Sequence, residues 1–332
     1  MVCNYANLDQ ASPIFTTKEN ISMKKLYFIF ILLFTVRMCS AQYYYYDNDH
    51  LDNAAILEAG GSVGLINCLT DIGGRKGLGS KFVKDVNFGN TQINGSLYFG
   101  LLYKYKWGLR VEASRGSVSA ADSVLKNYSG TESDPRLDRN VSFASDISTL
   151  TLIAEFYPTM VFETYDITKA APLGAPYLLA GIGLFHFNPQ TMYKGKLVDL
   201  QPLHTEGQGF PQLPNRKNYK LTQINIPIGL GFKYELSRNL NLRAEFIYYI
   251  LNTDYLDDVS KTYVDPALFA KNLSGDQLQK AMDLNYRGYE IGKNHDHNPG
   301  APRGSAKNND AYFTFNVKVG YIFNRSKIKY DY

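Results

Sequence analysis

The stretch AYFTFNVKVGYIF, residues 311–323, alternates strictly between two kinds of side chain. One set is apolar: Ala311, Phe313, Phe315, Val317, Val319, Tyr321 and Phe323. The other set is mostly polar or small: Tyr312, Thr314, Asn316, Lys318 and Gly320. Successive side chains of a β-strand point to opposite faces, whereas a helix would scatter both sets around its circumference. The stretch therefore predicts a strand with one apolar face and one polar face.

The same two-residue period recurs in seven earlier stretches, near residues 55–65, 97–105, 109–113, 147–157, 177–187, 224–234 and 240–248. The links after the second and sixth stretches are short, and the link after the fourth, at 158–175, is intermediate. The other links run to roughly 25 to 60 residues, so the long loops gather at one end. Transmembrane barrels have an even number of strands, short periplasmic turns and longer outer loops. We expect an all-β, eight-stranded antiparallel transmembrane β-barrel with long loops at one end and both chain ends periplasmic.

Composition agrees with a folded, strand-rich protein. The 332 residues carry a formal net charge of +4 and are 45% hydrophobic, which excludes a disordered chain and gives no reason to expect nucleic acid as a partner. Aromatic residues make up 14% of the chain, with 26 tyrosines and 19 phenylalanines beside 27 glycines. This mixture favours strands and tight turns.

The N-terminal region has the pattern of a secretory signal peptide at residues 23–41. A basic start at Met23–Lys25 precedes the apolar stretch LYFIFILLFTV at 26–36, and small residues precede the expected cleavage after Ala41. Residues 1–22 are interpreted as a misassigned start or an extension. The mature chain, 42–332, is expected to be a single barrel domain with a short, basic periplasmic tail.

Cysteine usage gives a further expectation. Cleavage after Ala41 removes Cys3 and Cys39 and leaves Cys68 as the single thiol. An intrachain disulfide is then impossible, so the stability of the mature chain must come from elsewhere.

The period alone leaves open which face lies inside. In a soluble, lipid-carrying barrel the apolar face would point inward and the charges would form an ordinary solvated surface. Two features favour the opposite arrangement. Aromatic residues lie near strand ends, as interfacial girdles require: Tyr103, Tyr105, Tyr234, Tyr248, Tyr321 and Phe323. The polar faces carry both signs of charge, predicting an interior charge network: Glu58, Arg110, Glu112, Glu155, Arg243, Glu245 and Lys318. Side chains fill an eight-stranded interior, which excludes a wide pore.

Candidate chemistry is sparse. The stretch NTDYLDDVSKTYVDP, 252–266, holds Asp254, Asp257, Asp258 and Asp265, which suggests an active site or a calcium site as one alternative. The other interpretation is that these aspartates leave the seventh strand and accept backbone donors in turns. His295-Asp296-His297 could bind a metal, but no zinc or calcium motif accompanies it, and a solvated loop is the simpler interpretation. No nucleophile motif such as GxSxG is present. We expect no catalysis, no metal and no cofactor.

Four stretches carry a family resemblance: GIGLFHFNP at 181–189, DLQPLHTEGQG at 199–209, DYLDDVSKTY at 254–263 and RGSAKNNDAYFTFNVKVGYIF at 303–323. They resemble the PorG-type outer-membrane barrels of Bacteroidetes, with Asp254, Tyr255, Asp257 and Asp258 as a signature loop. The resemblance implies an accessory of the type IX secretion system, which also supports gliding motility in some species. It implies contact with a periplasmic ring of the lipoprotein PorK and of PorN, in the outer membrane of a Gram-negative bacterium.

Two other functions stay open. The long loops at 188–219 and 251–309 could make the protein a surface receptor or adhesin. The loops could also assemble a membrane-embedded enzyme such as a lipid hydrolase, although no motif supports one.

Overall fold

A computed structural model describes residues 55–73, 88–123, 138–162, 174–237, 239–293 and 298–323. All of them belong to one unit, Asp47–Tyr332. The predicted extension 1–22, the signal peptide 23–41, the 295–297 motif and the basic tail after residue 323 lie outside the described residues. These expectations therefore remain predictions.

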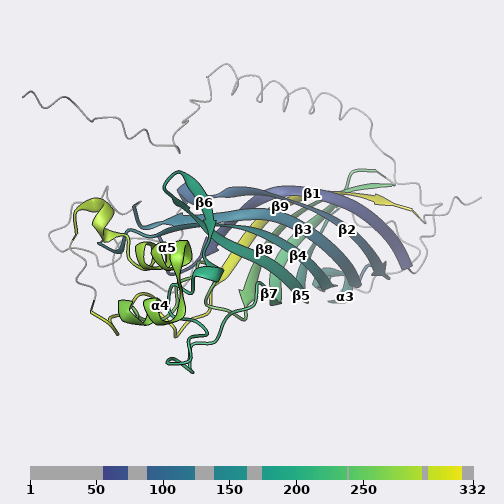
Figure 1. Cartoon of the computed structure of the whole chain (residues 1–332). Coiled ribbons are helices and arrows are strands. Elements are labelled where there is room, and N and C mark those ends of the chain that lie inside the picture. Colours follow the sequence, from purple (N-terminus) through teal and green to yellow (C-terminus); the bar gives the residue numbers. More distant parts are fainter. Residues whose placement is uncertain are drawn as a thin grey trace, which may run out of the picture. The chain divides into compact units, whose positions relative to one another are not determined.

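Eight long strands form the barrel wall (Figure 1). They are β1 (Ala55–Leu69), β2 (Gln92–Tyr103), β3 (Trp107–Ala121), β4 (Ser142–Phe156), β5 (Gly174–Tyr193), β7 (Thr222–Glu235), β8 (Leu240–Leu251) and β9 (Ala311–Ile322). Each pairs with the next in antiparallel fashion, and β1 also pairs with β9 in antiparallel register. The ladder is therefore closed, which confirms the predicted eight-stranded barrel.

The connections differ at the two ends of the barrel. At the short-turn end, three residues join β2 to β3, and two of them, Lys104 and Tyr105, have φ of 49° and 57°. The helix α3 (Pro158–Phe162) follows β4 at the same end. The opposite, long-loop end carries a short strand and several helices: β6 (Lys196–Asp199), α4 (Pro266–Asn272), α5 (Gly275–Asn285), and the 3-10 turns η3 (Phe88–Asn90), η5 (Gln201–Leu203) and η6 (Gly288–Ile291). In the described part of the chain, no helix is both long enough and apolar enough to span a membrane.

The wall extends beyond the predicted strands at the long-loop end. β5 reaches Tyr193 rather than residue 187, and β3 reaches Ala121 rather than residue 113. The short strand β6 continues the sheet by pairing with the end of β5, from Gln190↔Asp199 to Tyr193↔Lys196. In the extensions of β3 and β5 most outward side chains are small or polar, such as Ser117 and Asn188, so the apolar alternation fades although the backbone ladder continues.

The two faces of the wall differ as a membrane barrel requires. Large apolar side chains point outward and are exposed on every wall strand, among them Val63, Leu97, Val111, Leu150, Leu178, Leu230, Phe246 and Val319. The alternate positions are buried inside. A soluble barrel would bury its apolar face, so this arrangement overturns the lipid-carrier alternative.

One predicted girdle residue is placed differently. Tyr105 does not continue the outward face of β2, because the strand ends at Tyr103 and Tyr105 lies buried in the turn. The exposed side chains of Tyr103 and Trp107, a directly paired couple across the hairpin, mark the outer surface there.

Candidate functional sites: the interior charge network and the loop cap

The structure brings all seven predicted interior charges together inside the barrel. They come from inward-facing positions of five strands: Glu58 on β1, Arg110 and Glu112 on β3, Glu155 on β4, Arg243 and Glu245 on β8, and Lys318 on β9. Each of these side chains is almost completely buried. An unpaired charge in such a place would be costly, so the fold requires these charges to be paired.

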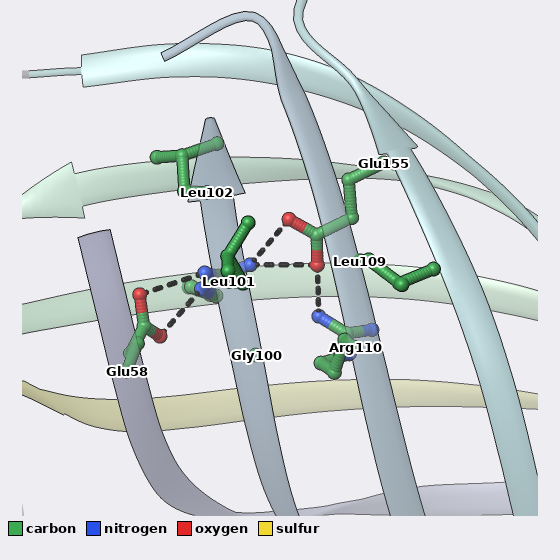
Figure 2. A pocket seen from close by; sticks show the side chains of 8 residues that line it. Glu58, Gly100, Leu101, Leu102, Leu109, Arg110 and Glu155 are labelled. Carbon is green, nitrogen blue, oxygen red and sulfur yellow. Dashed lines mark hydrogen bonds and ion pairs between the residues drawn. The ribbon is translucent and has the colours of Figure 1, made fainter. Parts of the chain in front are cut away.

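Two arginines hold the glutamates at the centre of the network. The Nη1 atom of Arg110 lies 2.5 Å from Oε1 of Glu155 and 2.7 Å from Oε1 of Glu245, and Nη2 lies 3.0 Å from Oε2 of Glu245. Arg243 forms a bidentate pair with Glu58, at 3.0 and 2.8 Å, and its Nη1 lies 2.9 Å from both carboxylate oxygens of Glu155. Figure 2 shows the carboxylates of Glu58 and Glu155 in this arrangement, with Arg110 below Glu155. The guanidinium fork suits bidentate pairing of this kind.

Lys318 completes the network on the side of β9. Its ammonium group contacts Glu112 and lies 3.2 Å from Oε2 of Glu245. The Nε atom of Arg110 is 3.0 Å from Oε2 of Glu112, close enough for Coulomb attraction but not aligned as a hydrogen bond. The ion pairs of Arg110 therefore join β3 to β4 and β8. Those of Lys318 join β9 to β3 and β8.

Four further members of the network were missed in the sequence. Lys233 on β7 lies 3.1 Å from Oε2 of Glu58, which brings a sixth strand into the network. The hydroxyl groups of Tyr98 and Tyr177 donate to Glu58 and Glu245, and that of Tyr157 donates to Glu155 at 2.8 Å. Those that lie on strands occupy inward-facing positions of the two-residue alternation, as the predicted members do. Lys233 pairs with Arg243 across the sheet, and Tyr98 pairs with Glu112. This alternation is the sequence signal that could have identified them as interior residues.

The network leaves almost no free space. Beside Arg110, Arg243 and Glu58, a space of about 10 Å³ remains near Gly100, at the limit of what one water needs. Two glycines make room for the tyrosines. A Cβ on Gly231 would come within 2.4 Å of the Tyr177 ring, and a Cβ on Gly320 would come within 2.4 Å of the Tyr98 hydroxyl. The described side chains therefore fill the interior tightly around Arg110 and Arg243.

A second buried cluster lies at the long-loop end, where two arginines tie four loops together. Arg139 pairs with Asp122 at 2.8 and 2.9 Å, donates to the carbonyl of Asp71 at 2.9 Å and donates to the carbonyl of Arg303. Arg303 in turn lies 3.1 Å from Oε1 of Glu206. The partners come from the loops after β1, β3, β5 and β8, and we call the described residues of these loops the loop cap.

The loop cap has its own apolar core. Buried side chains from the loops after β5 and β8 pack together: Leu200, Leu203, Phe210, Tyr219, Leu256, Val259, Val264, Phe269, Ala281 and Leu284. Phe210 meets Phe269 edge to face at 5.8 Å, and Tyr219 stacks on Tyr255 at 4.8 Å. These loops are therefore a folded element and not loose connections.

The signature aspartates lie inside this cap. Asp257 is fully buried and accepts the backbone N–H groups of Ile72 at 3.0 Å and Val259 at 2.9 Å. Asp258, also fully buried, has φ of 64° and accepts from the hydroxyl groups of Thr205 and Tyr219. Both side chains are therefore enclosed by other loops and do not reach the surface.

The other two aspartates of the stretch differ from this pair. Asp265 caps α4 by accepting the N–H of Ala267 at 2.9 Å. Asp254 is half-buried, and its Oδ2 has no hydrogen-bond partner among the described residues. The stretch therefore combines two aspartates that accept backbone N–H groups, one that accepts hydroxyl groups, and one with a single unpartnered carboxyl oxygen.

Burial shifts the titration of these carboxyl groups. It raises the pKa of Asp254 to about 8 and, together with the charge of Asp71, that of Asp257 to about 8. It raises the pKa of Asp258 to about 6, and that of Asp310 well above its ordinary value. Across the described ranges, no group of three or more histidine, cysteine, aspartate or glutamate side chains has an arrangement that could hold a metal ion.

The closed antiparallel ladder satisfies the backbone of the wall, its outer surface is apolar, and its interior holds paired charges. These three properties define a transmembrane β-barrel of the outer-membrane type. The chain is a transmembrane β-barrel whose apolar outer face suits contact with lipid.

The sequence matches no family model, and no curated protein matches it. Among solved structures, the chain is similar to Neisserial surface protein A, with 10% identity and a TM-score of 0.36 over 82% of this chain and 98% of that one. A major outer membrane protein from Thermus thermophilus has 12% identity and a TM-score of 0.35, over 82% and 100% of the two chains. Ail of Yersinia pestis, in complex with the heparin analogue sucrose octasulfate, has 10% identity and a TM-score of 0.31, over 81% and 97%. The assignment to a class rests on the strand ladder and its two faces.

Proposed function

We propose that the protein is a non-enzymatic, structural barrel that serves as an accessory of the type IX secretion system. The observation that carries the structural role is the filled interior, where two arginines and two lysines bridge four glutamates across six strands. A barrel sealed in this way offers no route for a protein or a large solute. Its use to the cell must then lie at its surfaces.

The resemblance to PorG-type barrels supplies the particular system. In this proposal the short-turn end, with the β2–β3 turn and α3, faces the periplasm and contacts the ring of PorK and PorN. Exposed Lys104 and half-exposed Lys106 in that turn are available to a partner. In species that glide, the same contact would support motility.

Deleting the gene and measuring export of cargo with a C-terminal sorting domain tests this role. We expect export to fall and the ring to lose its attachment to the outer membrane. A matched pair of complementing variants sharpens the result. Lys104→Glu combined with Lys106→Glu should weaken co-purification with the ring, whereas Lys217→Glu combined with Lys220→Glu, exposed at the other end, should not. Normal export and an intact ring after deletion would refute the role while leaving the barrel in place.

A second candidate is a surface receptor or adhesin. The loop cap favours it, because loops with their own apolar core present a fixed outer surface, including α4 and α5, as a binding protein requires. Replacing residues 266–285 by a short Gly/Ser linker should abolish ligand or cell binding and leave ring association unchanged. Unaltered surface binding by this variant would exclude α4 and α5 as the recognition element.

A further inference from the structure

An apolar groove lies on the outer face of the wall, where β3, β4, β5 and β7 follow one another in the sheet. It has a volume of about 460 Å³, far more than the space left beside the interior charge network. Thr151 and Gly183, a directly paired couple of β4 and β5, line its base. The side chains around it are all apolar and exposed: Val111, Leu150, Leu152, Ile182, Leu184 and Ile224.

The strand ladder is irregular beside this groove. The pairing of β5 with β7 skips residues 181–182 on β5 and 226–227 on β7. Pro227 lies in this interval, and its ring nitrogen has no hydrogen to donate to a ladder. Ile182, from the same interval, lines the groove. The hollow therefore coincides with an interruption of the ladder, which distinguishes it from the regular surface of the wall.

A row of polar side chains borders the groove on its long-loop side. The row runs across the four strands in register, each member paired with the next: Arg115, Ser148, His186 and Thr222. All four side chains are exposed, and the His186 ring lies 3.0 Å from the Thr222 hydroxyl. Ser148, His186 and Thr222 each lie two residues from a side chain of the groove on the same face, about 7 Å along a strand. The groove and this polar row therefore form one continuous amphipathic surface.

The charges beside the polar row have both signs. Arg115 forms an exposed pair with Asp146 at 3.4 Å, and such a pair is weak, so both groups stay available to a ligand. Asp146 lies on the same face of β4 as Ser148, two residues nearer the long loops. Lys220 and Asp199, both exposed beside β5, add one further charge of each sign. From the groove outward, the surface thus presents apolar side chains, then donors with a cation, and then a carboxylate.

We propose that the groove and its polar row form a binding site for a membrane lipid with a phosphoethanolamine headgroup. One acyl chain fills the groove, the phosphate group accepts hydrogen bonds from Arg115 and Ser148, and the ammonium group donates to Asp146. Lipid is the expected occupant because the outer face of a transmembrane wall meets acyl chains. The apolar groove, the donors and the carboxylate also follow one another in the order of the parts of such a lipid. This site depends on the barrel alone and goes beyond the secretion role.

Native mass spectrometry of the full, folded barrel in detergent tests the proposal. The protein is mixed with equal amounts of phosphatidylethanolamine, phosphatidylcholine and phosphatidylglycerol that carry the same acyl chains. Only the ethanolamine lipid combines the phosphate with a positively charged amine that can donate hydrogen bonds to Asp146. We expect one bound ethanolamine lipid, retained at least about threefold more than either other lipid, as one exposed charge contact provides. Equal retention of the three lipids, or a preference for another one, would overturn the proposal.

A matched pair of variants locates the site on the wall. Val111→Trp fills the groove and should abolish selective retention, whereas Val63→Trp, exposed on β1 outside the groove, should keep it. Heat-modifiable migration on a gel establishes that each variant folds. Selective retention by folded Val111→Trp would reject the groove as the site. A dimer that forms in detergent and is lost in Val111→Trp would show that a second copy occupies the groove, and the lipid proposal would be wrong.

Two further variants separate the parts of the headgroup. Arg115→Ala should lower retention of all three lipids at least about threefold, because each carries a phosphate. Asp146→Ala should instead erase the preference for the ethanolamine lipid over the choline lipid. Both positions are exposed, so these variants decide the outcome if Val111→Trp fails to fold. A preference that persists in Asp146→Ala would contradict the assigned headgroup.

Discussion

Arg139 donates a hydrogen bond through Nη1 to the main-chain carbonyl of Arg303, so two buried guanidinium groups lie in one connected network. Arg139 follows β3 in the chain and Arg303 precedes β9. The bond therefore joins two loop residues that lie 164 positions apart. Each arginine also holds a carboxylate from another loop, Asp122 or Glu206. This relationship explains how the described parts of four long connections form one folded cap.

Arg303→Ala should open the cap without opening the barrel. Removing one partner of a buried ion pair typically costs about 3–5 kcal/mol, since Glu206 would stay buried without its charge partner. Limited proteolysis should then cleave within 252–309 at least tenfold faster than in the wild type. Arg115→Ala is the control, because its pair with Asp146 is exposed at 3.4 Å. Equal cleavage rates in Arg303→Ala and the wild type would contradict the role of the arginine.

Arg243→Ala should destabilise the barrel itself. Glu58 and Glu155 would both lose their bidentate partner in a buried site, and we expect a loss of about 3–5 kcal/mol in the free energy of unfolding. Arg243→Lys should recover only part of it, because an ammonium group cannot bridge two carboxylates in the same planar geometry. Urea unfolding in lipid vesicles measures both. A midpoint unchanged in Arg243→Ala would show that the network contributes little to stability.

Leu152→Arg tests the lipid-facing surface. Leu152 points outward from β4 within the apolar part of the strand, and an arginine at the bilayer midplane of a barrel costs about 2–4 kcal/mol. Ser148→Arg, on the same face four residues nearer the long-loop end, should cost much less, because polar side chains such as His186 surround it. Folding yields and unfolding midpoints in vesicles compare the two variants. Equal effects would place the membrane boundary elsewhere.

Cys68 should be unreactive in the folded protein. Its side chain is buried at the end of β1, and its Sγ lies 3.9 Å from the carbonyl oxygen of Ser119. With the predicted signal peptide removed, it is the single thiol of the chain. A maleimide reagent should label the folded barrel at least a hundredfold more slowly than the heat-denatured protein, on the order expected for a site that reacts only through opening. Rapid labelling of folded protein would indicate a different register for β1.

The barrel could be predicted from the sequence because its determinant is local. In a membrane barrel each strand alternates lipid-facing and interior side chains, as residues 311–323 do, and the pattern is visible without knowledge of any partner. The same parity placed Glu58, Arg243 and their partners inside. Tyr98, Tyr177 and Lys233 share that parity, yet tyrosine fits either face of a strand and Lys233 lies near a strand end, so these members were overlooked.

The loop cap could not be predicted in the same way. Its order depends on contacts between loops far apart in the chain, such as Arg139 with Arg303 and Ile72 with Asp257. No period-two pattern marks such contacts, and the acidic stretch at 252–266 has the composition of an exposed turn. Tyr105 was misplaced for a related reason, because two left-handed residues end β2 before the apparent alternation does.

Solute efflux from lipid vesicles is the sharpest test of a membrane barrel whose interior is filled by side chains. The purified chain is reconstituted into vesicles, and heat-modifiable migration on a gel establishes the folded fraction. We expect that the protein inserts in folded form and that ions and small sugars leave these vesicles no faster than they leave protein-free vesicles. Efflux that rises with the folded fraction and falls with solute size would contradict it, as would a protein that remains soluble and folded without detergent or lipid.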